Sequence, residues 1–333
     1  MAPIPIIHDG DHGGDDFIAT LLLLAYPELF NLLGIMTVSG NTNAKQAAYN
    51  AATAVALAKK YCRRHDIGDV PIHSGALQSL EMGYRLSDDA FGQDGLGSVQ
   101  FKGIDESSIS SLHSTEEQQD ALIWLCHTLK SAAEPVSICV TGPGTNIARL
   151  ITDHSDLTHK IKQIIIMGGG INPSGNVRPY AEFNFYMDPH AADIIIQSGI
   201  NTVLHSLDST HQVVYTKARQ KAFQKLNIAH KQELNAILRL TEDLEKKSFD
   251  AEGAFPHDSQ TVYYLANPEN YELEAVQARV LKDRDEDEKG RLVLSPSSDS
   301  SLKIVRHNKN PDMFFDFLFE GMHRLFNRDG NEI

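Results

Sequence analysis

The 333-residue sequence predicts an α/β protein with one domain, residues 1–333. We expect a mostly parallel central sheet flanked by helices, with small antiparallel additions near the C-terminus. Short apolar runs alternate with stretches of helical period along most of the chain, as they do in β-α-β units. The run at 163–167 is apolar on both faces, which is typical of a central parallel strand. No repeat or linker-like segment divides the chain.

The expected elements follow in chain order. Short apolar runs predict strands at residues 4–8, 33–38, 70–73, 136–140, 163–167 and 202–208. Helical period predicts helices at residues 18–25, 44–61, 114–130 and 190–198, the third opening with a capping-box pattern. Residues 215–249 are helical but more polar, which indicates an excursion outside the sheet core. The last elements expected are a helix at 259–265, antiparallel strands at 271–280 and 291–294, and an amphipathic helix at 311–326.

The turn after the first strand carries the densest chemistry in the sequence. Asp9, Asp11, Asp15 and Asp16 lie within eight residues, between a short apolar strand and a buried helix. The helix dipole stabilises Asp15 and Asp16 in the first helical turn, but Asp9 and Asp11 still repel them. Four like charges in so small a volume are costly unless a cation binds or some of them stay protonated, and a cation is the simpler answer.

The available ligands favour a hard cation. They are mostly oxygens, which suits Ca²⁺ or Mg²⁺ better than Zn²⁺. An EF-hand is excluded, because Gly13 and Thr20 stand where such a loop needs an acidic or amide residue and a glutamate. The alternative is a solvated acidic loop, which the apolar flanking segments disfavour.

Charge and composition narrow the classes of partner. The net charge is −14, and the only basic cluster is at residues 59–64, so a nucleic-acid partner is not expected. The N-terminus lacks the features of a signal peptide, and no apolar run is long enough to span a bilayer, so we expect a cytoplasmic protein without membrane contact. Three widely spaced cysteines are consistent with reduced thiols.

Further polar groups follow other predicted strands. Asn41 stands at the carboxyl end of the second strand, where α/β folds gather polar side chains, although a simple turn asparagine is equally consistent with its position. Residues 141–146 form another strand-to-helix turn. The glycines at 168–170 match neither a dinucleotide nor a P-loop fingerprint, and a polar cluster at 176–184 comes after them.

These motifs together resemble the inosine-uridine-preferring nucleoside hydrolase family. Residues 9–16 resemble its DxDxGxDD signature, and residues 39–41 resemble the GN after its second strand. Residues 141–146 are similar to its TGPLTN turn. The family's MGG, GN, AEFN and DP blocks have counterparts at 167–189, and its late HD pair has one at 257–258. The blocks occur in family order over nearly the whole chain.

The resemblance implies a calcium ion at the carboxyl ends of the strands. Its ligands would be Asp11, Asp16, Asp258 and the main-chain carbonyl of Thr141, with Asp9 behind them. Polar side chains would bind the ribose hydroxyls, and one methionine would pack beside them: Asp15, Asn41, Asn176, Glu182, Asn184 and Met167. The resemblance further implies a homodimer or homotetramer that acts in purine or pyrimidine nucleoside salvage.

The chemistry expected of these residues is hydrolysis of an N-glycosidic bond. Its transition state resembles an oxocarbenium ion, so the site needs negative charge, a positioned water and help for the departing base. Ca²⁺ acidifies water weakly, so we expect Asp11 to be the base. The resemblance places His257 beside the leaving base, although a hydrogen-bonded structural histidine is the alternative reading.

The sequence leaves the base preference open. Phe91 stands where many family members carry a histidine that faces the substrate, so an aromatic stack is one replacement. The glycine-rich residues 76–105 lack a clear period and are expected to form a lid or a disordered loop. We expect residues 76–105 and the polar helical segment at 215–255 to form the pocket for the base. The aromatic residues expected to line that pocket are Tyr84, Phe91, Phe183, Tyr215 and Phe249.

Two other functions compete with the hydrolase. A DxD phosphatase of the haloacid-dehalogenase type would need Thr or Val two residues after the second Asp, where this chain has Gly13. A non-catalytic ribose or Ca²⁺ binder would keep the pocket without turnover. Ribose release from inosine, uridine, cytidine and adenosine would separate the binder from the hydrolase.

Overall fold

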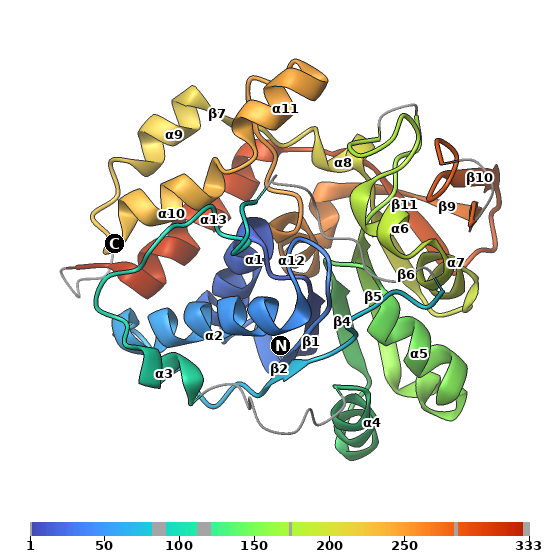
Figure 1. Ribbon diagram of the computed structural model, residues 1–333, viewed down its shortest axis with the longest axis horizontal. Coiled ribbons are helices and arrows are strands. Elements are labelled where there is room, and N and C mark those ends of the chain that lie inside the picture. The colour runs from blue at the N-terminus through green and yellow to red at the C-terminus, as the bar shows by residue number, and fades with distance from the viewer. Residues whose placement is uncertain (1, 82–90, 112–120, 173–174, 283–285, 329–333) are drawn as a thin grey trace.

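A nine-stranded mixed sheet dominates the fold (Figure 1). The computed structural model describes residues 2–81, 91–111, 121–172, 175–282 and 286–328. Across the sheet the strands lie in the order β10-β9-β11-β6-β5-β4-β1-β2-β3. Their bounds are Ile4–Gly10 (β1), Phe30–Thr37 (β2), Ile72–Ser74 (β3), Val136–Val140 (β4), Ile161–Met167 (β5), Thr202–His205 (β6), Tyr271–Val280 (β9), Leu292–Pro296 (β10) and Leu302–Asn308 (β11).

The helices lie on both faces of the sheet and around its carboxyl edge. The longer ones are Gly14–Ala25 (α1), Ala44–Tyr61 (α2), Ala121–Ser131 (α4), Thr145–Asp153 (α5), Pro189–Gln197 (α7), Lys217–Phe223 (α9), Lys231–Leu238 (α10), Glu242–Phe249 (α11), Ser259–Ala266 (α12) and Pro311–Phe326 (α13). The short ones are Glu106–Ser110 (α3), Phe183–Met187 (α6) and Leu207–Thr210 (α8). Figure 1 shows α9, α10 and α11 together on one side of the molecule, away from α4 and α5.

Two apolar cores sandwich the sheet. Successive residues of a strand point to opposite faces, so Ile165 of β5 packs into one core while Ile164 and Ile166 pack into the other. The first core contains α1, α2, α12 and α13, and the second contains α4, α5 and α7. Burial on both faces explains why the central strands are apolar throughout, as the sequence predicts.

The strand order reverses beside β1, and this reversal positions the site. From β1 the chain proceeds to β2 and β3 in one direction, and later from β4 to β5 and β6 in the other. All these neighbours are parallel, so the turns after β1 and β4 leave the sheet at the same edge. Such a reversal opens a crevice at the carboxyl ends of the strands.

The predicted fold class is confirmed, with differences in detail. Strands β9 and β10 pair antiparallel, as expected, but β11 was not predicted and inserts between β6 and β9. The predicted strand at 202–208 ends at His205, because Leu207 and Asp208 already belong to α8. The polar excursion consists of the short strand Tyr215–Thr216 (β7) and helices α9 to α11, and β7 pairs with Gly253–Ala254 (β8).

Two predictions concern residues that the structure does not describe, namely the capping-box pattern at 114–117 and Tyr84. The described parts of the 76–105 segment form turns and bends, and four of its glycines have positive φ: Gly92, Gly95, Gly97 and Gly103. None of the three cysteines is in a disulfide. Within the described ranges, no helix is both long and apolar enough to cross a membrane.

Candidate active site

The turn after β1 and the turn after β2 meet through Asp11 and Asn41. The backbone nitrogen of Asn41 donates to Oδ2 of Asp11 at 2.6 Å, and its side-chain nitrogen donates to Oδ1 at 3.2 Å. Gly40 permits this approach, because a side chain there would collide with the Asp11 carboxylate. Asn41 therefore lies in the turn after β2 and also contacts the acidic site through Asp11.

Three carboxylates from the two ends of the chain converge next to Asp11. Asp15 and Asp16 begin α1, and Asp258 directly precedes α12. One oxygen from each lies within 4.8 Å of the others, close enough to share a metal ion. Among the described residues these three carboxylates form the candidate metal cluster. Two of them, Asp16 and Asp258, were expected as ligands, and Asp15 was expected to bind ribose. Asp11, which was also expected as a ligand, lies next to the cluster.

Thr141, at the end of β4, completes this wall of the site. Its hydroxyl donates to Oδ1 of Asp16 at 2.5 Å and bonds to Nε2 of His8 at 2.8 Å. Its main-chain carbonyl accepts from the side-chain amide of Asn184 at 3.0 Å, and Thr141 is among the residues that line the cavity described below. The residue thus offers a carbonyl to the site while its side chain holds Asp16.

Burial raises the pKa of each of four carboxyls in the cluster. The pKa of Asp9 and that of Asp11 rise to about 7, and those of Asp16 and Asp258 rise well above their usual range, with their acidic neighbours adding to the effect of burial. Oδ2 of Asp9 and Oδ1 of Asp15 are buried without hydrogen-bond partners among the described residues. A divalent cation would relieve this repulsion, and the all-oxygen donor set suits Ca²⁺.

Two further groups support the acidic cluster from behind. Asn146 donates to Oδ1 of Asp9 at 2.7 Å and to the carbonyl of Thr37 at 3.1 Å, which ties the β4 turn to β1 and β2. His8 bridges Thr20 and Thr141 through its two ring nitrogens, and burial lowers its pKa so that it stays neutral. Neither His8 nor Asn146 was assigned a role from the sequence, although Asn146 lies in the motif at 141–146.

A cavity of about 580 Å³ opens above these carboxylates. Most of the site residues expected from the sequence line it: Asp15, Asn41, Phe91, Thr141, Met167, Asn176, Glu182, Phe183, Asn184, His257 and Asp258. Asp9, Asp11 and Asp16 are fully buried beneath it. Residues from the first and last thirds of the chain therefore share one cavity.

The expected ribose-binding residues are also tied to the surrounding backbone. Glu182 caps α6 by accepting from the backbone nitrogens of Asn184 and Phe185, and it accepts another bond from Gly169. Oδ1 of Asn176 accepts from the Phe183 nitrogen at 2.9 Å. The amide oxygen of Asn184 and the amide nitrogen of Asn176 have no partner among the described residues, so both can bind a hydroxyl group.

His257 is held on both sides by residues that the sequence did not indicate. Its Nδ1 lies 2.7 Å from the Thr210 hydroxyl, and its Nε2 lies 3.3 Å from Oε1 of Glu245. Burial opposes protonation of the ring, but the hydrogen bond and charge of Glu245 outweigh it and raise the pKa of His257. His257 thus lines the cavity with both ring nitrogens hydrogen-bonded, so a donor role toward a base would require Nε2 to exchange its bond to Glu245.

Part of the cavity lining is apolar. Phe91, Leu244 and Phe249 belong to it, and Ser248 lines the cavity as well. Tyr215 was a wrong candidate for this wall. Its ring is fully buried against Phe315, and its hydroxyl donates to Asn235 at 2.9 Å.

Comparisons with known proteins agree with this geometry. Residues 6–316 match the family model described as inosine-uridine preferring nucleoside hydrolase. An uncharacterised protein of Schizosaccharomyces pombe is 31% identical over 329 residues, which cover 96% of this chain and 99% of that protein. The pyrimidine-specific ribonucleoside hydrolase RihA of Salmonella enteritidis is 34% identical over 267 residues, 80% of each chain.

Solved structures share the fold over nearly the full length. A plant nucleoside hydrolase superposes with a TM-score of 0.81 at 26% identity, covering 97% of this chain and 99% of that one. A purine-preferring ribonucleoside hydrolase from Gardnerella vaginalis also gives 0.81, over 96% and 98% of the two chains. Its identity is 22%, so this second likeness concerns the fold alone.

Proposed function

The chain belongs to the inosine-uridine preferring nucleoside hydrolase family and is an N-glycosyl hydrolase of ribonucleosides, and we propose that it works with Ca²⁺ bound at the acidic cluster. The observation that carries the proposal is the convergence of Asp15, Asp16 and Asp258 beneath a cavity lined by amide and carboxylate side chains. The family match leaves the phosphatase hypothesis without support.

The proposed calcium ligands are Asp11, Asp16, Asp258 and the carbonyl of Thr141. Asp15, which lies in the same cluster, would bind either a ribose hydroxyl or the calcium ion. When bound, Ca²⁺ supplies positive charge that neutralises the cluster and orients water and hydroxyl groups without strongly acidifying them. Oδ1 of Asp15, which is buried without a hydrogen-bond partner among the described residues, supports a cation at this cluster.

Asp11 is the proposed general base. Its two oxygens accept hydrogen bonds from Asn41, which fix the carboxylate in one orientation. Asp11 would accept the proton from the attacking water as the bond to the anomeric carbon forms and the glycosidic bond breaks.

The remaining residues would orient the ribose and the departing base. Oδ1 of Asp15 has no hydrogen-bond partner among the described residues, and Asn176 and Asn184 line the same cavity, so the three would bind the ribose hydroxyls. Glu182 would add negative charge near the oxocarbenium-like carbon. His257 would donate a proton or hydrogen bond from Nε2 to the leaving base in place of its long bond to Glu245, while Thr210 holds Nδ1. Phe91 and Phe249 would contact the base through their rings.

For the substrate we propose a class of compound rather than one nucleoside. The substrate is a ribonucleoside, and the products are a free base and ribose, which would feed purine or pyrimidine salvage. RihA is named as pyrimidine-specific and the Gardnerella enzyme as purine-preferring, so relatives do not point to one base. We propose a homodimer or homotetramer, which light scattering coupled to gel filtration would test.

The test of this function is ribose release. The protein is incubated with inosine, uridine, cytidine and adenosine in the presence of Ca²⁺, and reducing sugar is measured. We expect release from at least one nucleoside and a loss of at least about 100-fold in Asp11→Asn, because a general base contributes roughly that much. Calcium binding without ribose release from any nucleoside would support the non-catalytic binder instead.

A further inference from the structure

Residues 91–98, which we call the strap, bring Phe91 to the active-site cavity. Figure 1 shows this segment in teal between α2 and α10. Phe91 lines the active-site cavity and also a narrow cavity of about 20 Å³, which it shares with Ile18 and Leu240. Because the ring borders two cavities, close packing does not fix it, and its position depends on the backbone of the strap.

The strap is folded tightly on itself. Oδ1 of Asp94 accepts from the backbone nitrogens of Leu96 at 3.0 Å and Ser98 at 3.1 Å. The backbone nitrogen of Gly97 donates to the carbonyl of Phe91 at 2.8 Å. Phe91 is therefore tied to this turn, and a contact that holds Asp94 also holds the backbone of Phe91.

Asn50 joins the strap to the turn after β1. This residue lies on α2 and is 1% exposed. Its side-chain nitrogen donates to the carbonyl of Asp94 at 2.7 Å and to the carbonyl of His12 at 2.9 Å. An amide nitrogen carries two protons, so each segment receives one. Oδ1 of Asn50 accepts from the Gln46 side chain at 3.0 Å, which fixes the orientation of the amide.

The turn that Asn50 contacts carries Asp11, the proposed general base. His12, the next residue, has a φ of 29°, in the left-handed region that few residues other than glycine adopt. The strap approaches this turn closely at Gly95, where a Cβ would lie 3.2 Å from the Asn50 amide nitrogen and 3.6 Å from the His12 carbonyl oxygen. The strap, the amide and the turn are therefore in mutual contact.

Two other contacts attach the strap but orient it less. Leu96 is buried in the first core, and apolar burial does not depend on direction. The Thr42 hydroxyl donates to the carbonyl of Gln93 at 3.3 Å, a longer bond than either of those made by Asn50. Hydrogen bonds weaken as they lengthen, so the two bonds of Asn50 fix the strap most closely.

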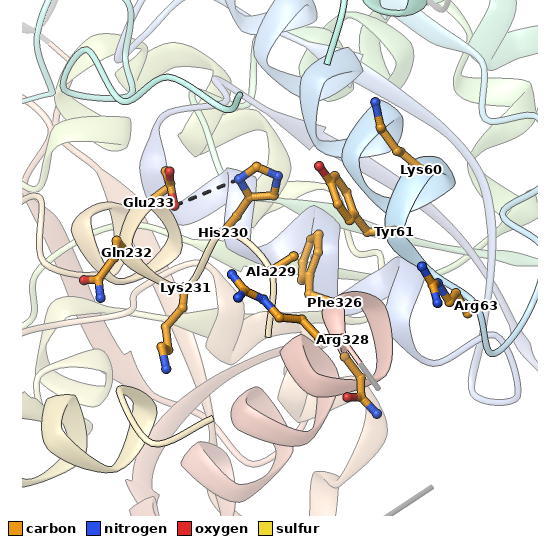
Figure 2. A pocket seen from close by; sticks show the side chains of 11 residues that line it. Lys60, Tyr61, Arg63, Ala229, His230, Lys231, Gln232, Glu233, Phe326 and Arg328 are labelled. Atoms are coloured by element: carbon orange, nitrogen blue, oxygen red, sulfur yellow. Dashed lines mark ion pairs between the residues drawn. The ribbon is translucent and has the colours of Figure 1, made fainter. Parts of the chain in front are cut away.

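The chain after the strap is held separately. The ring of Phe101 stacks on Phe17 with 5.4 Å between centroids, and it meets the ring of His230 edge-on at 5.4 Å. Figure 2 shows His230 beside Tyr61, the last residue of α2, and these two rings lie 4.8 Å apart. Tyr61 lies roughly 16 Å along the helix from Asn50, so these ring contacts do not replace the bonds of Asn50.

We propose that Asn50 is a positioning residue, which fixes the strap on the Asp11 turn and so sets where the Phe91 ring meets the base. Asn50 does not line the active-site cavity, so it acts through Phe91. The inference rests on the proposed contact between Phe91 and the base. Asp11 itself is held by two hydrogen bonds from Asn41, so calcium binding is expected to depend little on Asn50.

Steady-state kinetics of Asn50→Leu in two backgrounds test this coupling. Leucine has nearly the shape of asparagine but no donors, so we expect KM for the hydrolysed nucleoside to rise about fivefold or more, with kcat changed less than about twofold. In Phe91→Ala the same change is expected to raise KM by less than about twofold, because the ring is already absent. Equal rises in KM in the two backgrounds, or a loss of calcium affinity as large as the rise in KM, would overturn the proposal.

A second variant and a control separate this effect from a loss of folding. Asn50→Ser leaves a smaller polar side chain and is expected to raise KM by at least about twofold. Thr53→Val is the matched control, because it removes a hydrogen bond to the Tyr49 carbonyl within α2, and its KM is expected to match that of the parent protein. A Thr53→Val variant that raises KM as much as Asn50→Leu would show a general effect of α2 and would also overturn the proposal.

Hydrogen exchange of the free protein tests the anchoring without hydrolysis. The amides of Leu96, Gly97 and Ser98 are hydrogen-bonded within the strap. We expect them to exchange at least about fivefold faster in Asn50→Leu and at the parental rate in Thr53→Val. Unchanged exchange in Asn50→Leu contradicts the proposal. If the parent protein releases no ribose from any nucleoside, the proposed function fails, whereas faster exchange in Asn50→Leu still supports the anchoring of the strap by Asn50.

Discussion

The carboxylate of Asp258 lies beside that of Asp16, although one precedes α12 and the other begins α1. Helices α1 and α12 pack together in the first core, so the folding of the whole domain brings these charges together. Their mutual repulsion is a cost of folding, and among the described residues this is the group of three carboxylates close enough to share a metal ion. A bound cation accounts for that cost, and the predictions below follow from it.

Calcium affinity is expected to fall as the pH is lowered from 8 to 5. Asp9 and Asp11 have pKa values of about 7 in the metal-free site, so below pH 7 they retain protons that Ca²⁺ must displace. Binding therefore releases protons, and affinity rises with pH until the carboxyls are ionised. Calorimetry in buffers of different ionisation enthalpy measures that release. A calcium affinity that does not change over this range would contradict the assignment.

Thr141→Val is expected to weaken calcium binding by about 10-fold. The change keeps the main-chain carbonyl but removes the hydroxyl that donates to Asp16, and groups that orient metal ligands typically contribute 10- to 100-fold. Thr141→Ser retains the hydroxyl and should stay within about threefold of the parent protein. Fluorescence-monitored calcium titration compares the two. Equal affinities in the valine and serine variants would show that the hydroxyl does not orient Asp16.

Glu245→Gln is expected to lower kcat by at least about tenfold and to leave calcium affinity unchanged. Glu245 holds His257 and favours its charged form, and an acid at the leaving base contributes a factor of 10² to 10⁴. Glu252→Gln is the matched control, because Glu252 is exposed and does not line the cavity. Steady-state kinetics and calcium titration separate the outcomes. A Glu245→Gln variant with unchanged kcat would leave His257 as a structural residue only.

Phe91→Ala is expected to raise KM by about 10- to 100-fold with a smaller change in kcat. Removing the ring forfeits roughly 1.5–3 kcal/mol of apolar contact with the base in both the ground state and the transition state. Phe101→Ala removes a ring that stacks on Phe17 outside the active-site cavity, and it serves as the control. If KM is unchanged in Phe91→Ala while kcat falls, Phe91 does not contact the base.

Much of the fold was predictable because the central strands are buried on both faces. Ile164 to Ile166 are apolar on both faces, which predicts a central strand directly. Strand β11 was missed because Lys303, Arg306 and His307 interrupt its apolar residues. Only the tertiary structure shows that Ile304 and Val305 occupy the two cores.

The site was predictable where residues form local motifs and not elsewhere. The carboxylates at 9–16 are adjacent in sequence, and the resemblance supplied the distant Asp258. Glu245 lies on α11 among charged residues that read as a solvated helix face, yet it is 5% exposed and bonded to His257. Thr210 belongs to no motif. The partners of His257 are set by packing between distant segments, which a single sequence does not reveal.

The most direct measurement is the binding of Ca²⁺ to the parent protein and to Asp258→Asn by titration calorimetry at pH 8. The account predicts one calcium per chain in the parent protein and affinity weakened by at least about 100-fold in the variant, since removing one carboxylate leaves the site short of charge and of a ligand. Asp243→Asn, which neutralises an exposed carboxylate on α11, should bind like the parent protein. Unchanged calcium affinity in Asp258→Asn would contradict the metal site and the hydrolysis proposed to depend on it.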